Sequence, residues 1–455
     1  MPIPLSLTEP GLEQTLEDST GSLIRRSILP GGIRLITERD PSVRSASVGF
    51  WLPVGSRDEA PEHAGSTHVL EHLLFKGTPS RTALEIATAF DEVGGETNAA
   101  TAKEHTCYYA RVRSADLPMA ISVLADMVTS PLLDEDAFLT EREVILEELA
   151  MAEDDPTDVG FEAVMADVLG PDTALGRPVG GTPETVMAVG LENVRDHYRE
   201  HYAPERLLVT AVGDVDHVQV RELVLAAVSA GGWSLADGAL PTPMRSTTAY
   251  RMPPEKRSMR ELRRDTEQTH VFIGGPSITA VDDRRQAMTV LMSILGGGMS
   301  SRLFQEVRER RGLAYSVYSY HSAFRDAGMA GMYAACRAKS ADAVADLLVA
   351  EVERMAEHGI TDDELRRALG QITGSMALGL EDTQSRMARL ATSELLQGQF
   401  RSVDEALDAF NAVERPQVQQ LAAEMADAVG TRVDVGPERT PTQAIPTTTS
   451  EENQR

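Results

Sequence analysis

Residues 66–78, STHVLEHLLFKGT, place three ionisable side chains in a segment that is otherwise rich in Val, Leu and Phe. His68, Glu71 and His72 stand at positions i, i+3 and i+4, so on a helix they share one face. Burying them without partners would be costly, and this set of residue types favours a metal ion as the partner. The pattern H-x-x-E-H predicts that the two histidines hold one zinc ion and that Glu71 holds a water molecule beside it.

A zinc ion that acts in catalysis needs a third protein ligand as well as an open position. Residues 140–155, TEREVILEELAMAEDD, offer carboxylates on a predicted helix. Glu141 and Glu148 lie on the side of this helix that also carries apolar residues. The spacing alone does not choose between Glu147 and Glu148, although Glu148 shares the apolar face and Glu147 points further toward solvent.

The H-x-x-E-H pattern occurs a second time, at His197, Glu200 and His201. Charged and polar residues surround this copy, and Pro204 ends the helix soon after it. We therefore expect a solvated helix face, with His201 near the carbonyl groups of the last turn. At the first copy the alternative to a metal is a pair of core histidines satisfied by backbone groups. That alternative does not readily accommodate two histidines and a carboxylate on one buried face.

Composition restricts the class of protein. The chain has 455 residues, a net charge of −27 and two cysteines, Cys107 and Cys336. Its length predicts two or more domains, and its acidity disfavours nucleic acid as a partner. The negative charge is compatible with basic peptide substrates or with a solvated acidic surface. No apolar run is long enough to predict a membrane span, the N-terminus does not resemble a secretory signal, and the few cysteines suit a reducing, cytoplasmic location.

Helix and strand patterns predict two halves with the same order of elements. In each half a strand precedes two helices, a pair of strands, several further helices and a last strand. The first half spans residues 22–233 and the second half 263–436, and a Pro-, Ser- and Thr-rich linker over 234–262 joins them. Residues 1–21 are predicted to be an N-terminal extension and residues 437–455 a disordered tail.

The two opening helices can be aligned with each other. His68, Glu71 and His72 then fall opposite residues that do not ionise, namely Thr289, Met292 and Ser293. The alignment predicts one metal site per chain, in the first half, and a second half without metal ligands.

Several stretches of the chain resemble the pitrilysin family of zinc peptidases, the inverted zincins. They are GSTHVLEHLLFKGT, GGETNAATAKEHTCYYA, EREVILEELAMAEDDP, HYAPERLLVTAVGDV and SSRLFQEVRERRGLAYSVYS. The resemblance covers residues 22–436 and is closest to the β subunit of the mitochondrial processing peptidase and its bacterial single-chain relatives. It implies an α+β fold of two structurally similar domains, each a mostly antiparallel β-sheet packed with helices, arranged as a clamshell.

The resemblance assigns a role to each residue of the metal site. It implies that His68, His72 and Glu148 bind one Zn²⁺ per chain and that Glu71 is the general base. Glu141 would support the ligands from the second shell.

The resemblance also suggests how a peptide substrate is bound. Thr97, Asn98 and Ala99 match an edge strand along which the substrate backbone lies. In the second half, VRERRGLAY matches a segment that reaches the substrate with an arginine and a tyrosine, here Arg308 and Tyr315. The alternative is a surface arginine and a half-buried strand tyrosine.

Asp158 and Glu162 match acidic positions that contact a basic residue of the substrate in processing peptidases. A solvated helix face is the alternative for both side chains. These residues therefore extend the expected substrate site only on the strength of the resemblance.

The function implied is that of a zinc-dependent endopeptidase acting on extended peptides or unfolded segments. Family members of this length commonly pair, as homodimers or with an inactive homologue. Two alternatives keep the same fold: a noncatalytic structural subunit, and a module that binds peptides without hydrolysis. The short glycine run at 296–298 favours the catalytic type, because the noncatalytic partner in the family carries a long glycine-rich loop there.

Overall fold

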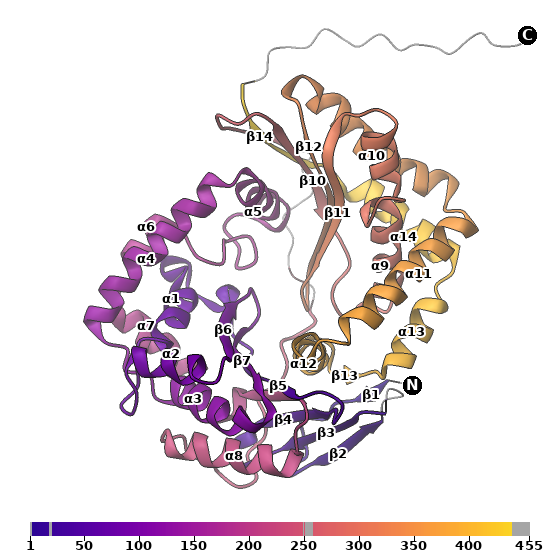
Figure 1. The fold of residues 1–455 in the computed structure, drawn as a ribbon. Coiled ribbons are helices and arrows are strands. Elements are labelled where there is room, and N and C mark those ends of the chain that lie inside the picture. Colours follow the sequence, from indigo (N-terminus) through magenta and orange to yellow (C-terminus); the bar gives the residue numbers. More distant parts are fainter. Residues whose placement is uncertain (1, 18–20, 249, 251–257, 439–455) are drawn as a thin grey trace, which may run out of the picture.

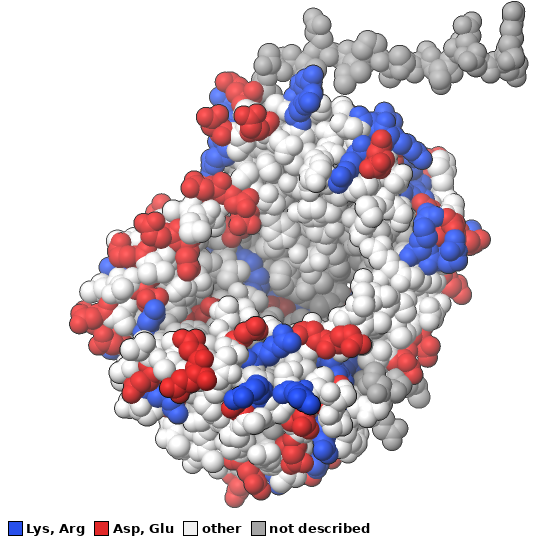
Figure 2. All heavy atoms as spheres, in the orientation of Figure 1, with Lys and Arg blue, Asp and Glu red and all other residues white. Residues whose placement is uncertain are grey.

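The computed structural model describes residues 2–17, 21–248, 250 and 258–438. The two halves of the chain each contain a β-sheet packed with helices, and they face each other across the centre of the molecule (Figure 1). The space-filling view shows a deep hollow between the halves (Figure 2). Acidic side chains gather on the helices of the first half, to the left of this hollow.

The first sheet has seven strands in the order β2-β3-β4-β8-β5-β7-β6. Its strands are β2 (Glu13–Glu17), β3 (Leu23–Ile28), β4 (Arg34–Arg39), β5 (Ser45–Leu52), β6 (Glu96–Thr101), β7 (Thr106–Arg113) and β8 (Leu208–Gly213). The last strand in sequence, β8, inserts between β4 and β5, parallel to the former and antiparallel to the latter. All of its residues are buried, which explains why its sequence is apolar rather than alternating.

The second sheet repeats the topology of the first. Its strands are β9 (Ser258–Arg263), β10 (Thr269–Pro276), β11 (Ala314–Ala323), β12 (Gly328–Cys336) and β14 (Thr431–Gly436), in the order β11-β12-β10-β14-β9. Again the last strand in sequence, β14, inserts between two earlier strands, parallel to β9 and antiparallel to β10. This order matches β6-β7-β5-β8-β4 of the first sheet. The predicted α+β fold of two structurally similar domains is therefore confirmed.

Helices cover both sheets. In the first half they are α1 (Ser66–Leu74), α2 (Ala83–Asp91), α3 (Leu117–Thr129), α4 (Glu135–Asp154), α5 (Pro156–Leu169), α6 (Pro183–Ala188), α7 (Leu191–His201) and α8 (His217–Ala230). In the second half they are α9 (Arg285–Gly296), the π-helix η6 (Phe304–Glu309), α10 (Ala341–His358), α11 (Asp362–Gly379), α12 (Thr383–Thr392), the π-helix η8 (Ser393–Gln397), α13 (Val403–Asn411) and α14 (Arg415–Ala428). Short 3-10 turns are η1 (Pro30–Gly32), η2 (Ser56–Asp58), η3 (Pro61–His63), η4 (Ser114–Asp116), η5 (Pro204–Arg206) and η7 (Ala338–Ser340).

One helix from each half packs on the sheet of the other half. The helix α5 packs on β10 and β14 of the second sheet, where Val164 lies in one apolar cluster with Phe272. Reciprocally, α12 packs on β5 and β8 of the first sheet, where Met387 and Leu390 join Trp51. The opposite face of each sheet carries helices of its own half. The halves are therefore held together by buried apolar surface as well as by the chain between them.

The terminal and linking segments add to this arrangement. The strand β2 lies within residues 1–21 and pairs with β3, and β1 (Ile3–Pro4) pairs with β13 (Gln399–Phe400) of the second half. The strand β9 begins inside the predicted linker and ends at Arg263. Residues 249 and 251–257 of that linker, and most of the predicted tail, lie outside the described residues. The domain boundaries therefore stay predictions.

Within the described part of the chain, no helix combines the length and the apolar character that crossing a membrane requires.

A glycine marks the closest approach of α5 to the second sheet. A Cβ atom on Gly160 would lie 2.1 Å from Cε2 of Phe272, a side chain that is completely buried. We expect Gly160→Ala to lower the free energy of unfolding by about 1–3 kcal/mol, because the packed ring cannot move aside without strain.

Urea denaturation of the full chain measures this effect. The matched control is Gly370→Ala on an exposed face of α11, where nothing lies within 4 Å of the added atom. That substitution should leave stability unchanged or raise it by up to about 1 kcal/mol. Equal effects of the two substitutions would contradict the exchanged-helix packing.

Candidate functional site

The helix α1 presents His68 and His72 on one side, as the spacing predicts. Its opposite face buries Val69, Leu70 and Leu73 in the core of the first half. The start of the helix is fixed by Glu59, whose carboxylate accepts hydrogen bonds from the backbone N–H groups of Gly65 (2.8 Å) and Thr67 (2.7 Å). These bonds satisfy free donors at the helix N-terminus, and they act against burial, which raises the pKa of Glu59 to about 7.

Three possible metal-binding atoms converge where α1 meets α4. The Nε2 atoms of His68 and His72 lie 3.3 Å apart, and Oε2 of Glu148 lies 3.8 Å from the first and 3.4 Å from the second. A tetrahedral zinc ion with ligand distances of about 2.0–2.1 Å separates its ligands by about 3.3 Å. The observed spacing therefore fits one zinc ion. Among the described residues, His68, His72 and Glu148 form a group of side chains close enough together to hold a metal ion.

Glu141 and Lys76 set the orientation of one ligand. Nδ1 of His72 lies 3.1 Å from Oε2 of Glu141, which is almost fully buried. Donation of the Nδ1 proton to this carboxylate leaves the lone pair of Nε2 free for a metal. The ammonium group of Lys76 lies 2.7 Å from the other oxygen of Glu141 and balances its charge. Glu141 contacts His72, and its expected role as a support for a metal ligand stays a prediction.

His68 is neutral, as metal binding requires. Burial, together with the neighbouring His72, lowers the pKa of His68 to about 4. The imidazole is therefore neutral at pH 7. Its Nδ1 is buried and has no hydrogen-bond partner among the described residues.

Glu71 lies on α1 between the two histidines and contacts the first sheet. The hydroxyl of Thr101, at the end of β6, donates a hydrogen bond to Oε2 of Glu71. Burial raises the pKa of Glu71, and the Thr101 bond opposes that shift. A carboxylate with a raised pKa, fixed by one oxygen, is suited to accept and return a proton.

The expected substrate strand lies at an edge of the first sheet. Thr97, Asn98 and Ala99 belong to β6, which pairs with β7 on one side and, among the described residues, has no strand on the other. The carboxamide oxygen of Asn98 accepts a hydrogen bond from the N–H of Ala99 at 2.8 Å. An extended peptide can add to such an edge through its main chain.

Asp158 and Glu162 line a cavity of about 340 Å³ beside α5. The lining also includes Lys103, which is 8% exposed and whose ammonium group donates to the carbonyl oxygen of Arg177. Burial lowers the pKa of Lys103 to about 8, although Glu162 acts against that shift. Both carboxylates are exposed, as on a solvated helix face, and both line this cavity, so their expected contact with substrate stays a prediction.

Arg308 and Tyr315 are brought together in the second half. The guanidinium of Arg308, on the π-helix η6, stacks 4.4 Å from the ring centre of Tyr315 and donates to its carbonyl oxygen at 3.0 Å. Tyr315 is 75% exposed. No contact among the described residues joins either side chain to His68, His72 or Glu148, so their expected role at the site stays a prediction.

The prediction that the second H-x-x-E-H pattern lies on a solvated helix face is wrong for His197. This side chain is buried, and its Nε2 lies 3.1 Å from the hydroxyl of Thr67 on α1. Burial, together with the neighbouring His201, lowers the pKa of His197 to about 3. The polar neighbours misled the interpretation because they occupy the outer face of α7, whereas His197 turns inward under the helix that carries the site.

Sequence reasoning missed three side chains that support the site, namely Glu59, Lys76 and Thr101. Lys76 follows His72 by four residues, a spacing that could have placed it near Glu141. Thr101 lies on the strand β6 and Glu59 in a turn before α1. No local spacing therefore links either residue to the face of α1 that carries the site.

Comparison with known proteins identifies the family and agrees with this fold. Residues 34–182 match the sequence model described as insulinase (peptidase family M16), and residues 188–372 match the one described as the peptidase M16 inactive domain. A Streptomyces coelicolor protein named an uncharacterized zinc protease is 50% identical, over 88% of this chain and 87% of its own. A Bacillus subtilis protein with the same description is 35% identical, over 89% and 96%.

Solved structures share the fold at low sequence identity. A protease from Helicobacter pylori superposes with a TM-score of 0.80 at 21% identity, over 94% of this chain and all of its own. A peptidase M16 inactive domain from Pseudomonas fluorescens gives 0.78 at 18% identity, with the same coverage. From its sequence relatives, the chain belongs to peptidase family M16, the pitrilysin family of zinc metallopeptidases.

Proposed function

We propose that the protein is a zinc-dependent endopeptidase that hydrolyses extended peptides or unfolded segments in the manner of processing peptidases. The observation that carries this proposal is the convergence of His68, His72 and Glu148 at the separations a zinc ion requires, with Glu71 on the same helix. The relatives named zinc proteases support the same class of activity.

The residues of the site divide the chemistry among them. Zinc, when bound by His68, His72 and Glu148, lowers the pKa of water and polarises the scissile carbonyl. Glu71 removes the proton from the attacking water and returns it to the leaving nitrogen. Thr101 holds one oxygen of Glu71, so that the other faces the reaction.

The proposed substrate path runs along β6. An extended peptide adds to the edge at Thr97, Asn98 and Ala99, which restricts substrates to unfolded segments. Asp158 and Glu162 then receive a basic side chain in their cavity, in keeping with the net charge of −27. Tyr315 and Arg308 contact the peptide from the second half, where the hydroxyl of Tyr315 can donate to the developing oxyanion.

We further propose a cytoplasmic enzyme that pairs with a second copy or with an inactive homologue. Both cysteines are free and buried, which fits a reducing compartment. The alternatives, a structural subunit or a peptide-binding module, do not require the orientation that Glu141 imposes on His72 or the hydrogen bond from Thr101 to Glu71.

The third ligand is tested by comparing two neighbouring carboxylates. We expect Glu148→Gln to abolish stoichiometric zinc binding, because a neutral amide replaces the one anionic ligand of the set. Glu147→Gln, an exposed neighbour on the same helix, should bind zinc like the wild type. Zinc content after dialysis, measured by atomic absorption, distinguishes the two. Loss of zinc from the Glu147 variant instead would show that the wrong carboxylate was assigned.

The general base is tested by Glu71→Gln. This variant should retain one zinc ion yet lose about 10²–10⁴-fold in kcat/KM, because the amide cannot accept a proton. Cleavage of a fluorogenic peptide measures the activity, and addition of a chelator shows whether that activity requires the metal. Near wild-type turnover by the zinc-loaded variant would exclude Glu71 as the base.

The acidic cavity predicts a preference for basic substrates. Glu162→Gln should reduce kcat/KM for peptides with Arg or Lys near the cleaved bond by about tenfold, since a charge-assisted contact is lost. Peptides with neutral residues there should be cleaved as before. Glu135→Gln, an exposed position at the start of α4, is the control. A uniform loss across all peptides would argue against this contact.

A further inference from the structure

Two segments of the first half, residues 54–59 and 101–106, are bound to each other and form what we call the paired unit. The first precedes α1, and the second is the turn between β6 and β7 with the adjoining ends of those strands. Two backbone N–H groups of the first segment donate to carbonyl oxygens of the second, each at 3.1 Å. The hydroxyl of Thr106 donates to the carbonyl oxygen of Val54 at 2.9 Å. The segments are packed so closely that a Cβ atom on Gly55 would lie 2.2 Å from a carbonyl oxygen of the other.

The paired unit holds α1 at two points. At the start of the helix, the carboxylate of Glu59 accepts hydrogen bonds from the N–H groups of Gly65 and Thr67. Further along, the hydroxyl of Thr101 donates to the carboxylate of Glu71. A shift of the paired unit would therefore change the direction of the Glu71 carboxylate relative to the helix that carries the two histidines.

One residue of the second half binds this unit. Asp326 lies in the turn between β11 and β12, and its two oxygens accept hydrogen bonds from the two terminal nitrogens of Arg57 at 2.8 and 2.9 Å. The same guanidinium donates to Glu104 at 2.5 Å. The side chains of Arg57, Glu104 and Asp326 are 7%, 7% and 12% exposed. One buried guanidinium thus joins both segments of the paired unit to the second half.

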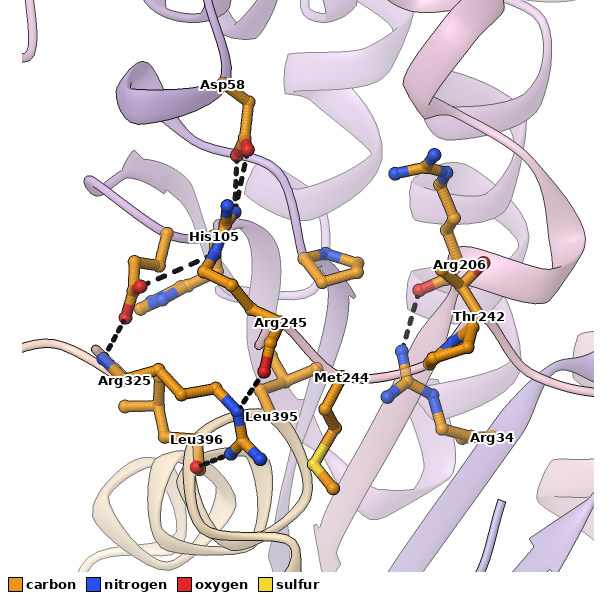
Figure 3. Close-up of a pocket in the computed structure, with 13 residues that line it drawn as sticks. Arg34, Asp58, His105, Arg206, Thr242, Met244, Arg245, Arg325, Leu395 and Leu396 are labelled. Atoms are coloured by element: carbon orange, nitrogen blue, oxygen red, sulfur yellow. Dashed lines mark hydrogen bonds and ion pairs between the residues drawn. The ribbon is translucent and has the colours of Figure 1, made fainter. Parts of the chain in front are cut away.

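Neighbouring contacts fix the turn that carries Asp326. The backbone N–H of Arg325 donates to the second oxygen of Glu104 at 3.2 Å, and its guanidinium donates to the carbonyl oxygen of Arg245 in the linker. Figure 3 shows Arg245 with its side chain directed at Asp58, which accepts both of its hydrogen bonds at 2.8 Å. Hydrogen bonds to charged groups are strong where water is largely excluded, so this turn has a defined position on the paired unit.

Other ion pairs also connect the halves, but they reach different elements. They include the pairs Arg26–Glu394 and Arg386–Glu38. These pairs connect the second half to β3 and β4, strands that carry none of the site residues. The ion pair of Asp326 differs from them because it ends on the unit that supports α1.

We propose that Asp326 is a positioning residue for the peptidase reaction: by holding Arg57, it fixes the paired unit and thereby the direction of the Glu71 carboxylate. This inference rests on the proposed function. The second half would then contribute to proton transfer in the first half without touching the substrate. Small displacements of a reacting group are costly to rate, so the effect should fall on turnover rather than on zinc binding.

The variant Asp326→Asn keeps the shape of the side chain and removes its charge. We expect kcat to fall about tenfold to a hundredfold, with KM near the wild-type value and one zinc ion retained. Asp40→Asn is the matched control, because Asp40 accepts from Arg386 across the halves at 2.6 Å and Arg386 keeps a second carboxylate, as Arg57 does. This control should lose a similar ion pair and keep the wild-type kcat.

A second variant, Arg57→Lys, tests the same contact from the first half. Its ammonium group retains the charge but cannot span both oxygens of Asp326 while also reaching Glu104. We expect a similar loss of kcat. The double variant with Asp326→Asn should be no slower than the slower single variant, because both changes remove one interaction.

Hydrogen exchange of the folded, zinc-loaded full chain, followed by mass spectrometry, gives a readout that needs no cleavage. The amides of residues 54–59 and 101–106 should exchange faster in Asp326→Asn than in the wild type and at the wild-type rate in Asp40→Asn. The proposal is overturned if Asp326→Asn leaves kcat and exchange unchanged, raises KM alone or loses zinc, or if Asp40→Asn lowers kcat as much. A wild type that cleaves no peptide would instead refute the proposed function, while exchange still tests the contact.

Discussion

Two imidazole nitrogens and a carboxylate oxygen point at one another, within 4 Å, where α1 packs on α4. Electron-rich atoms at this separation repel unless a cation or a proton lies between them. The lowered pKa of His68 disfavours a cationic imidazole, and the separations of the three atoms fit a metal ion between them. The rest of the first half can be understood as the support that keeps this convergence in place.

That support reaches the site from several directions. Glu59 fixes the start of α1, His197 lies beneath it, and Glu141 with Lys76 fixes the ring of His72. The strand β6 contributes at once the edge proposed for the substrate and the hydroxyl that holds Glu71. The exchange of α5 and α12 between the halves places the acidic cavity on a helix that is anchored in the opposite sheet. The position of that cavity therefore depends on how the two halves pack.

The sequence predicted those features that local spacing encodes. The shared helix face of His68 and His72 and the repeated order of elements follow from periodicity. Spacing could not decide between Glu147 and Glu148, because adjacent helical positions differ by only about 100° in direction. The exchange of α5 and α12 was not predicted, since an apolar helix face shows that something covers it but not which sheet. His197 was misjudged because charged neighbours describe the outer face of α7 and not the inner one.

The central claim is a single zinc ion between α1 and α4. Anomalous X-ray scattering from a crystal of the zinc-loaded protein, measured on both sides of the zinc absorption edge, tests it most directly. We expect one strong peak per chain, about 2.0–2.2 Å from Nε2 of His68, Nε2 of His72 and a carboxylate oxygen of Glu148. A map without a peak at this position, or with a zinc ion held by other residues, would contradict it.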